Sequence, residues 1–231
     1  MRRFYIEIAS LNIDALALPV EESKHACKVL RMKEGDHLEV INGKGELFIG
    51  FISAANPKKC IVERVDYKYY KQDAYRIHIA IAPTKMNDRF ETFLEKATEL
   101  GIHEITPLLC SNSERKKIKL DRYSKVVISA MKQSKRLYLP QLNSLTTFND
   151  FVEQHTGLIA HCEDGKKGKT EELLQPFDSP IIIGPEGDFT PQEISLALEN
   201  DFKPISLGKT RLRTETAGLY ACMLAKHKFE A

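Results

Sequence analysis

The sequence predicts an α/β protein of two domains, a small β-rich domain followed by a larger domain in which strands and helices alternate. Short alternating or apolar runs separated by turn signals fill the first seventy residues. From Arg76 onward such runs alternate with helical patterns, as in a sheet packed between helices. The chain has 231 residues, of which 42% are hydrophobic, so it is long enough and apolar enough to bury a core in each domain.

The N-terminal domain is expected to be a β-barrel with one inserted helix. Asn42 to Gly45 is a strong hairpin signal between two of its strands. Residues 21–35 predict a short helix that ends at Gly35, and the polar, aromatic segment Asp66–Tyr75 has no apolar period and predicts a linker. The predicted strands are residues 3–8, 36–42, 46–53 and 58–65. This domain therefore spans residues 1–70, and the second domain spans residues 71–231.

The second domain is expected to hold a parallel sheet with helices on both faces. Residues 157–162 and 179–184 are nearly continuous apolar runs, which is typical of buried parallel strands. One helix begins with Asn87 as its N-cap and ends at Gly101, and another begins with a capping box from Thr190 to Glu193. Further strands are predicted at residues 76–82, 103–109 and 203–208, and further helices at residues 123–137 and 213–229.

Several common chemistries are excluded because their motifs are missing. The chain has no GxGxxG after a strand, no GxxxxGK[ST], no HExxH and no GxSxG, so dinucleotide, P-loop, zinc-protease and hydrolase sites are not expected. The seven histidines and five cysteines lack metal-ligand spacing, so no metal is expected. Because the cysteines are odd in number and no signal peptide or membrane span is apparent, we expect a cytoplasmic protein with reduced thiols and no membrane partner.

Two glycine-rich loops follow two of the predicted strands. One begins with "GPEG" at Gly184, and the other begins at Gly208. Ligands of open parallel sheets bind at the carboxyl ends of the strands, where glycine lets a ligand touch the backbone. Tight turns with positive φ are the alternative explanation for these glycines. Glu186 lies inside the expected pocket, whereas Asp188 is explained by the dipole of the helix that follows.

The segment "LRTETAGLYA" opens the last predicted helix with a cation. Thr214 is expected to be the N-cap and Glu215 to lie in the first turn, which ordinary capping explains. Capping does not explain Arg213, because a positive charge near a helix N-terminus is unfavourable. We therefore expect Arg213 to face an anionic group, either a carboxylate or a substrate.

A basic segment lies in the middle of the chain. From Arg115 to Arg136, nine basic residues are opposed only by Asp121, which gives 9 − 1 = +8. A charge run is usually a solvated face, but solvated helices interleave acids four residues from bases, and only Asp121 and Lys125 do so here. The excess therefore predicts phosphate binding. The candidate RNA-binding residues are Arg115, Lys116, Lys117, Lys132 and Arg136, with His25 and Arg31 from a second basic cluster.

The sequence resembles the RsmE-type ribosomal RNA methyltransferases, a branch of the SPOUT superfamily. "IGPEGDFTPQEI" and "LGKTRLRTETAGLYA" resemble the two signature motifs of that family. "KMNDRFETFLEKATELGIHEITPL", "MKQSKRLYLP" and the opening "RRFYI" with "HACKVLRMKEGD" also resemble it. These segments cover nearly the whole chain in the family's order.

The resemblance implies a PUA-like RNA-binding β-barrel, a SPOUT domain with a deep trefoil knot, and a homodimer. It implies transfer of a methyl group from S-adenosylmethionine to N3 of one uridine in 16S rRNA of the small ribosomal subunit. The end of "LIAHC" is expected to form a third wall of the cofactor pocket, and Asp188 and Lys135 depart from the family pattern. The implied cofactor-binding residues are Gly184, Pro185, Glu186, Gly187, Leu207, Gly208, Leu212, Thr216 and Ala217.

The implied reaction requires uracil N3 to lose its proton before it accepts a methyl group. A glutamate with an ordinary pKa of about 4.3 is a poor base for so weak an acid. We therefore expect Arg213 to stabilise the uracil anion, and Glu215 to orient Arg213 or relay the proton. Two alternatives stay open: another SPOUT RNA methyltransferase that acts on a ribose 2′-hydroxyl, and a non-catalytic RNA-binding or ribosome-assembly protein.

Overall fold

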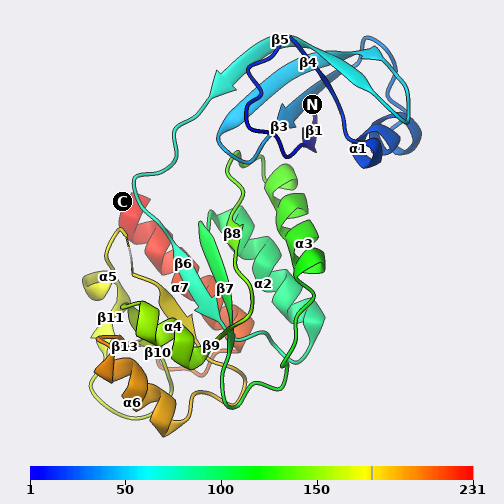
Figure 1. Ribbon diagram of the computed structural model, residues 1–231. Helices are drawn as coiled ribbons and strands as arrows, with labels where there is room; N and C mark the ends of the chain where they lie inside the picture. The colour runs from blue at the N-terminus through cyan, green and yellow to red at the C-terminus, as the bar shows by residue number, and fades with distance from the viewer. Residues whose placement is uncertain (178, 231) are drawn as a thin grey trace. The chain divides into compact units, whose positions relative to one another are not determined.

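The structure, a computed structural model, describes residues 1–177 and 179–230 (Figure 1). The chain divides into two compact units, each built around its own sheet. The first unit comprises Met1–Gln72 and Met131–Leu139, and the second comprises Asp73–Ala130 and Pro140–Ala231. The first unit thus includes residues 131–139 from the middle of the chain, which lie outside the range 1–70 predicted for the first domain.

An open, five-stranded sheet forms the first unit. The strand order is β1-β3-β4-β5-β2, with β1 parallel to β3 and the other pairs antiparallel. Because β1 and β2 are its edges, the pairing gives an open sheet where a closed barrel was expected. Phe4, Phe48 and Val62 lie in one fully buried cluster on this sheet. The strands are β1 (Arg2–Tyr5), β2 (Ala15–Ala17), β3 (His37–Ile41), β4 (Glu46–Ala54) and β5 (Ile61–Tyr69).

The helix between β2 and β3 is shorter than predicted. α1 (Val20–Lys24) continues into a π-helical turn, η1 (His25–Val29), after which Arg31 has a φ of 54°. Gly35 therefore does not end a helix. It has a φ of 88°, and its N–H donates to the carbonyl of Ile52 at 2.8 Å, so it fastens the turn before β3 to β4.

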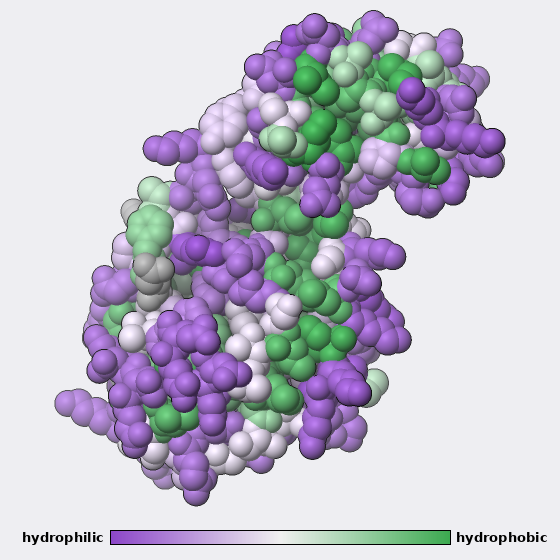
Figure 2. Space-filling model, in the orientation of Figure 1, coloured by the Kyte–Doolittle hydropathy of each residue, from purple (hydrophilic) through white to green (hydrophobic). Residues whose placement is uncertain are grey.

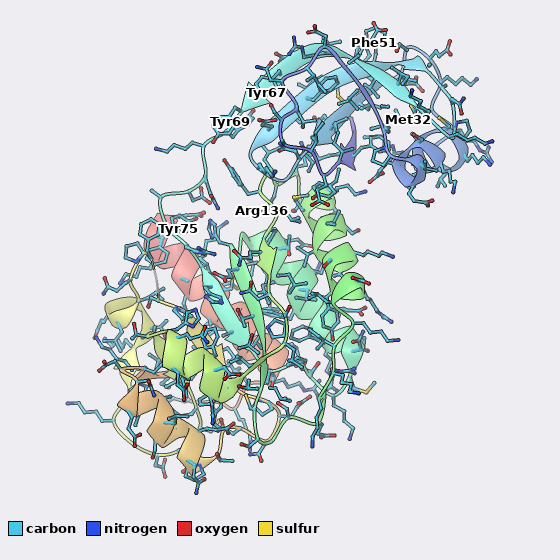
Figure 3. All side chains as sticks on the ribbon, viewed as in Figure 1. Met32, Phe51, Tyr67, Tyr69, Tyr75 and Arg136 are labelled. Carbon is cyan, nitrogen blue, oxygen red and sulfur yellow. The ribbon has the colours of Figure 1, made fainter. Side chains whose placement is uncertain are left out.

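The prediction of a linker over Asp66–Tyr75 is wrong at both ends. β5 continues to Tyr69, because Tyr67 pairs with Phe48 of β4 in the ladder. The ring of Tyr75 stacks on Phe229 of the second unit's last helix, with ring centroids 5.1 Å apart. Figure 3 labels the tyrosines at both ends of this connection, which shortens to residues 70–74.

The segment Met131–Leu139 is held in the first unit by apolar contacts and by backbone pairing. Met131 is buried in a cluster with Ile41 and Leu47. The N–H of Leu139 donates to the carbonyl of Gly43 at 3.0 Å. A hydrophobic stripe on a helix does not reveal which sheet it covers, so the sequence could not assign this segment.

The second unit holds the predicted parallel sheet. Its strand order is β11-β13-β10-β12-β6-β7-β8, all paired in parallel, and β9 pairs with β7. β12 therefore lies between β6 and β10, two strands that precede it in the chain. The strands are β6 (His78–Ile81), β7 (Glu104–Leu109), β8 (Gln141–Leu142), β9 (Thr146–Thr147), β10 (Leu158–Ala160), β11 (Gly168–Lys169), β12 (Ile181–Ile183) and β13 (Lys203–Ser206).

Helices cover both faces of this sheet, as predicted (Figure 1). On one face, Phe148, Phe151 and Ile194 pack with Ile159 and Ile182 of the sheet. The outer surface over α6 is mainly hydrophilic, as expected of a helix that covers a core with one side (Figure 2). The helices are α2 (Asn87–Leu100), α3 (Leu120–Gln133), α4 (Phe148–Gln154), α5 (Thr170–Leu173), α6 (Pro191–Glu199) and α7 (Thr214–Glu230).

The start of α6 agrees with the prediction from the sequence, and the start of α2 differs from it. The capping box of Thr190 and Glu193 forms at the start of α6, with Pro191 as the first helical residue. Asn87 does not cap α2; it lies inside the helix, and its side chain accepts a hydrogen bond from the hydroxyl of Tyr123 at 2.9 Å. α2 ends as predicted at Gly101, which has a φ of 99°.

Gly218 lets α7 pack closely against the other face of the sheet. A Cβ atom at this position would lie 2.7 Å from Cδ1 of Ile81 and 2.7 Å from Cε2 of Phe93. We predict that Gly218→Val lowers the free energy of unfolding by about 2 kcal/mol, because the added atoms overpack this contact. Leu198→Val in α6, where the side chain is 45% exposed, is the control and should change stability by less than about 0.5 kcal/mol. Urea unfolding followed by circular dichroism measures both, and equal effects would contradict this packing.

Candidate active site

Three neighbouring strands of the parallel sheet end level with one another. Ala160 of β10 pairs with Ile183 of β12 on one side and with Ile205 of β13 on the other. The loops that leave these strands therefore start side by side, at the edge where α/β proteins bind ligands. They enclose a cavity of about 550 Å³, within the usual size of small-molecule sites. Its lining comprises residues 160–162, 167, 183–186, 188, 205–214 and 217.

Most of the predicted site residues line this cavity. On α7, Thr214 and Ala217 face it, and the positions between them do not, because successive helical residues point in different directions. The lining includes Gly184, Pro185, Glu186, Leu207, Gly208, Leu212, Ala217 and the predicted catalytic Arg213. The lining does not include Gly187, Glu215 or Thr216.

The loop glycines are present for different physical reasons. Gly208 has a φ of 119° in open space, so the turn explanation applies to it. A Cβ on Gly184 would lie 3.0 Å from the ring of Phe189, and a Cβ on Gly187 would lie 3.1 Å from Cβ of Asn112. Close packing of the loop, and not its backbone conformation, therefore explains glycine at these two positions.

The N-terminus of α7 is attached to the end of β12 by Thr214. Its hydroxyl donates to the carbonyl of Gly184 at 3.0 Å. Thr214 begins the helix and does not cap it, because the N–H of Ala217 donates to the carbonyl of Arg213 at 2.8 Å. Arg213 thus holds the cap position, with an exposed side chain at the cavity.

The expected pairing of Arg213 with Glu215 is not made. Within residues 1–177 and 179–230, no carboxylate forms an ion pair with Arg213. Glu215 is half-buried, and its Oε2 atom is buried with no hydrogen-bond partner in this part of the chain. The described residues therefore leave the exposed guanidinium at the cavity without a paired carboxylate.

Asp188 joins two walls of the cavity, a role that the sequence analysis missed. Its Oδ2 accepts the N–H of Cys162 at 2.8 Å, and its Oδ1 accepts the N–H of Phe189 at 2.9 Å. Its φ is 62°, a conformation that aspartate tolerates better than most residues. Glycine would adopt this φ without strain but would lose the link to the β10 loop. Burial, aided by the Asp188 carboxylate, raises the pKa of the Cys162 thiol, so this pocket cysteine stays protonated.

His161 presents unpaired polar atoms to the cavity. Both ring nitrogens are buried and have no hydrogen-bond partner among the described residues. Burial lowers the pKa of the imidazole, and the Lys167 ammonium, which donates to the carbonyl of His161 at 2.7 Å, lowers it further. Leaving buried polar atoms unpaired is unfavourable, so the ring marks a place for a ligand to bond. The sequence signal was a histidine directly after an apolar strand.

The predicted RNA-binding residues are divided between the two units. Lys116 and Lys117 are exposed in the second unit, whereas Arg115 is half-buried there and donates to backbone carbonyls. Lys132 belongs to the first unit, where it pairs with Glu22 at 2.8 Å. His25 and Arg31, both exposed, and Arg136 also belong to the first unit (Figure 3).

Acids that are distant in sequence neutralise part of the +8 segment. Besides the Lys132–Glu22 pair, Arg122 forms an ion pair with Glu91 of α2. The local sequence shows only Asp121 as an opposing charge, so the net charge available to a polyanion is smaller than the sequence indicates.

Known protein families match nearly the whole chain. An RNA methyltransferase domain matches residues 71–226, and an RNA methyltransferase PUA domain matches residues 18–63. A Rickettsia conorii protein named ribosomal RNA small subunit methyltransferase E is 31% identical over 95% of this chain and 92% of its own length. The chain belongs to this family of RNA methyltransferases.

Solved structures share the fold of this methyltransferase. A probable rRNA methyltransferase from Porphyromonas gingivalis is 36% identical, with a TM-score of 0.88 over 100% of this chain and 99% of that one. A putative methyltransferase from Legionella pneumophila, solved with the bound cofactor S-adenosylmethionine, is 30% identical, with a TM-score of 0.88 over 97% and 96% of the two chains. The family resemblance drawn from the sequence motifs is thus confirmed.

Within residues 1–177 and 179–230 of this methyltransferase, no helix is both long and apolar enough to cross a membrane. The same residues contain no group of three or more histidine, cysteine, aspartate or glutamate side chains placed to hold a metal ion.

We predict that the His161 imidazole stays neutral at pH values where an ordinary histidine is half-protonated, about 6.5. Its pKa is lowered by burial and by Lys167, so Lys167→Met should raise the pKa part of the way back. Histidine NMR spectra recorded against pH measure both effects, and His161→Asn identifies the resonance. Titration of His161 at or above about 6.5 in the ligand-free protein would contradict this environment.

Proposed function

We propose that this methyltransferase transfers a methyl group from S-adenosylmethionine to N3 of a uridine in the 16S rRNA of the small ribosomal subunit. The observation that carries the proposal is the cavity at the level ends of β10, β12 and β13, walled by both glycine loops. Family membership supports the substrate, since the similar Rickettsia protein is named for the small-subunit ribosomal RNA.

The cavity suits S-adenosylmethionine, which the similar Legionella structure contains. It has the required size, and the unpaired nitrogens of His161 offer hydrogen bonds to the ligand. When bound, this ligand supplies an electrophilic methyl group on a sulfonium. We assign its binding to Gly184, Pro185, Glu186, Leu207, Gly208, Leu212 and Ala217, and Gly187 and Thr216 stay predictions from the resemblance.

Arg213 is the group to stabilise charge on the substrate. Its guanidinium is exposed at the cavity, and no carboxylate of the described chain neutralises it. Uracil N3 must lose its proton to expose a lone pair, and a positive donor beside a uracil oxygen stabilises the resulting anion. Glu215 is proposed as the proton relay, and its unpartnered Oε2 is an acceptor that supports this role.

We propose that one part of the chain binds RNA and the other catalyses the methyl transfer. Residues 1–70, which include the matched PUA domain, form the RNA-binding domain, and residues 71–231 form the catalytic domain. Basic side chains of both parts are proposed to contact phosphates: the exposed His25, Arg31, Lys116 and Lys117, and the half-buried Lys132 and Arg136.

A trefoil knot, a homodimer and a cytoplasmic location complete the proposal. The insertion of β12 between the earlier strands β6 and β10, followed by the return of Thr214 to Gly184, supports a threaded chain. Tyr220 and Met223, which are 41% and 52% exposed on α7, support a helix face covered by a second copy. The five free cysteines support the cytoplasmic location, because thiols stay reduced there.

A transfer assay tests the proposed function. Purified protein is incubated with labelled S-adenosylmethionine and with small subunits that lack base methylation, and the product nucleoside is identified by mass spectrometry. N3-methyluridine is the expected product. A 2′-O-methylated nucleoside would keep the pocket but change the acceptor atom, and no transfer together with no cofactor binding would favour the RNA-binding alternative.

We predict that Arg213→Ala lowers turnover by about 10²–10³-fold, the usual loss of a preorganised charge-stabilising donor. Its dissociation constant for S-adenosylmethionine should change by less than a few-fold, because the charge acts on the nucleobase. Single-turnover kinetics and calorimetry measure the two quantities. Turnover within a few-fold of the unsubstituted protein would remove Arg213 from the mechanism, and Arg213→Lys, which keeps the charge, should retain part of the rate.

We predict that affinity for RNA falls steeply with salt, because phosphate contacts release counterions. Replacing Lys116 and Lys117 together by alanine should reduce the slope of log K against log salt by about 1.4, or 0.7 for each contact to a single strand. Fluorescence anisotropy with a labelled rRNA fragment at several salt concentrations measures the slope. An unchanged slope would show that neither lysine contacts a phosphate.

A further inference from the structure

The guanidinium of Arg115 donates hydrogen bonds to backbone carbonyls of the loop between β6 and α2. Its Nε donates to the carbonyl of Thr84 at 2.9 Å, and its Nη2 donates to the carbonyl of Lys85 at 2.5 Å. Thr84 is fully buried, so its carbonyl has little access to water as a replacement. The planar guanidinium donates to two successive carbonyls from two separate nitrogens in a fixed fork, a geometry that the single nitrogen of lysine does not provide.

The same peptide links Arg115 to the cavity. The N–H of Lys85 belongs to the peptide group whose oxygen, on Thr84, accepts from Arg115, and it donates to Oε1 of Glu186 at 2.9 Å. A cation that donates to a carbonyl oxygen polarises that peptide group. The polarised peptide's N–H then donates a stronger hydrogen bond. Guanidinium, peptide and carboxylate thus form one chain of hydrogen bonds that ends on a residue of the cavity lining.

The loop that carries Arg115 also holds the chain on the other side of Glu186. Nδ2 of Asn112 donates to the carbonyls of Gly187 at 3.3 Å and Asp188 at 3.1 Å. The N–H of Ser111 donates to Oε1 of Glu193, in the capping box of α6, at 2.8 Å. Residues 111–115 therefore fix both the backbone that follows Glu186 and the orientation of its carboxylate.

We propose that Arg115 is a positioning residue of the methyl-donor site, which acts on Glu186 through the Thr84–Lys85 peptide. Glu186 is thereby held as an acceptor for a donor group of the bound ligand, such as its ammonium or a ribose hydroxyl. This inference rests on the proposed function of the cavity, and it replaces the phosphate-binding role predicted for Arg115. Lys116 and Lys117, which follow directly and are exposed, remain the phosphate contacts of this loop.

A double-mutant cycle on the full-length protein tests this positioning role. The dissociation constant for S-adenosylmethionine is measured by calorimetry, without RNA, for Arg115→Ala, Glu186→Ala and the double variant. Each single substitution should weaken binding by about tenfold, the contribution of one charge-assisted hydrogen bond. In the Glu186→Ala background, Arg115→Ala should weaken binding by less than twofold, because the residue through which it acts is already gone.

Two further variants separate positioning from general stability and from RNA contact. Arg115→Lys keeps the charge and is the second variant if Arg115→Ala does not fold; it should also bind the cofactor more weakly, since it loses the two-carbonyl contact. Lys117→Ala is the matched control, which should lower the salt slope of RNA binding and leave the cofactor dissociation constant unchanged.

The outcomes are distinguishable. Equal weakening by Arg115→Ala in the presence and absence of Glu186 would overturn the link between the two residues. An unchanged cofactor dissociation constant with a reduced salt slope would make Arg115 a phosphate contact and overturn the proposal alone. Failure of the unsubstituted protein to bind S-adenosylmethionine would overturn the proposed function and this inference together.

Discussion

The insertion of β12 between β6 and β10 is the constraint on which the rest of the site depends. Since all these strands are parallel and in register, their carboxyl ends meet at one edge, and three loops leave it side by side. The hydroxyl of Thr214 then bonds to the last carbonyl of that central segment, at Gly184, and draws the start of α7 to the same edge. A slip of β12 would displace the glycine loop, the attachment of α7 and the guanidinium of Arg213 together.

The site is built by backbone and packing more than by reactive side chains. Gly184 and Gly187 allow close approach of Phe189 and Asn112, and Asp188 accepts the backbone N–H of the neighbouring loop. His161, which lines the cavity, and Glu215, in the first turn of α7, each carry buried side-chain atoms that have no hydrogen-bond partner among the described residues. Such a cavity suits a ligand that contacts the protein over most of its surface. The charge of Arg213, which no described carboxylate neutralises, is available to the substrate.

Local signals in the sequence predicted the architecture of the second unit well. The apolar runs at β10 and β12, the capping box at Thr190 and the C-cap at Gly101 depend on residues close in the chain, and each is found. The glycine loops were placed at the cavity because strand ends of a parallel sheet share an edge. Asp188 was assigned to a helix dipole, because its bond to Cys162 spans 26 positions and leaves no local trace.

Long-range pairing explains the other differences between sequence and structure. The charge of the basic segment is reduced by Glu22 and Glu91, and Arg115 is taken up by carbonyls about thirty positions away. No local pattern shows such partners.

Hydrogen exchange of the backbone, with and without S-adenosylmethionine, tests most directly whether the three adjacent loops bind the cofactor. We expect slowed exchange in residues 161–167, 184–190 and 207–213. Cofactor binding that slows exchange elsewhere and leaves these loops unchanged would contradict this site.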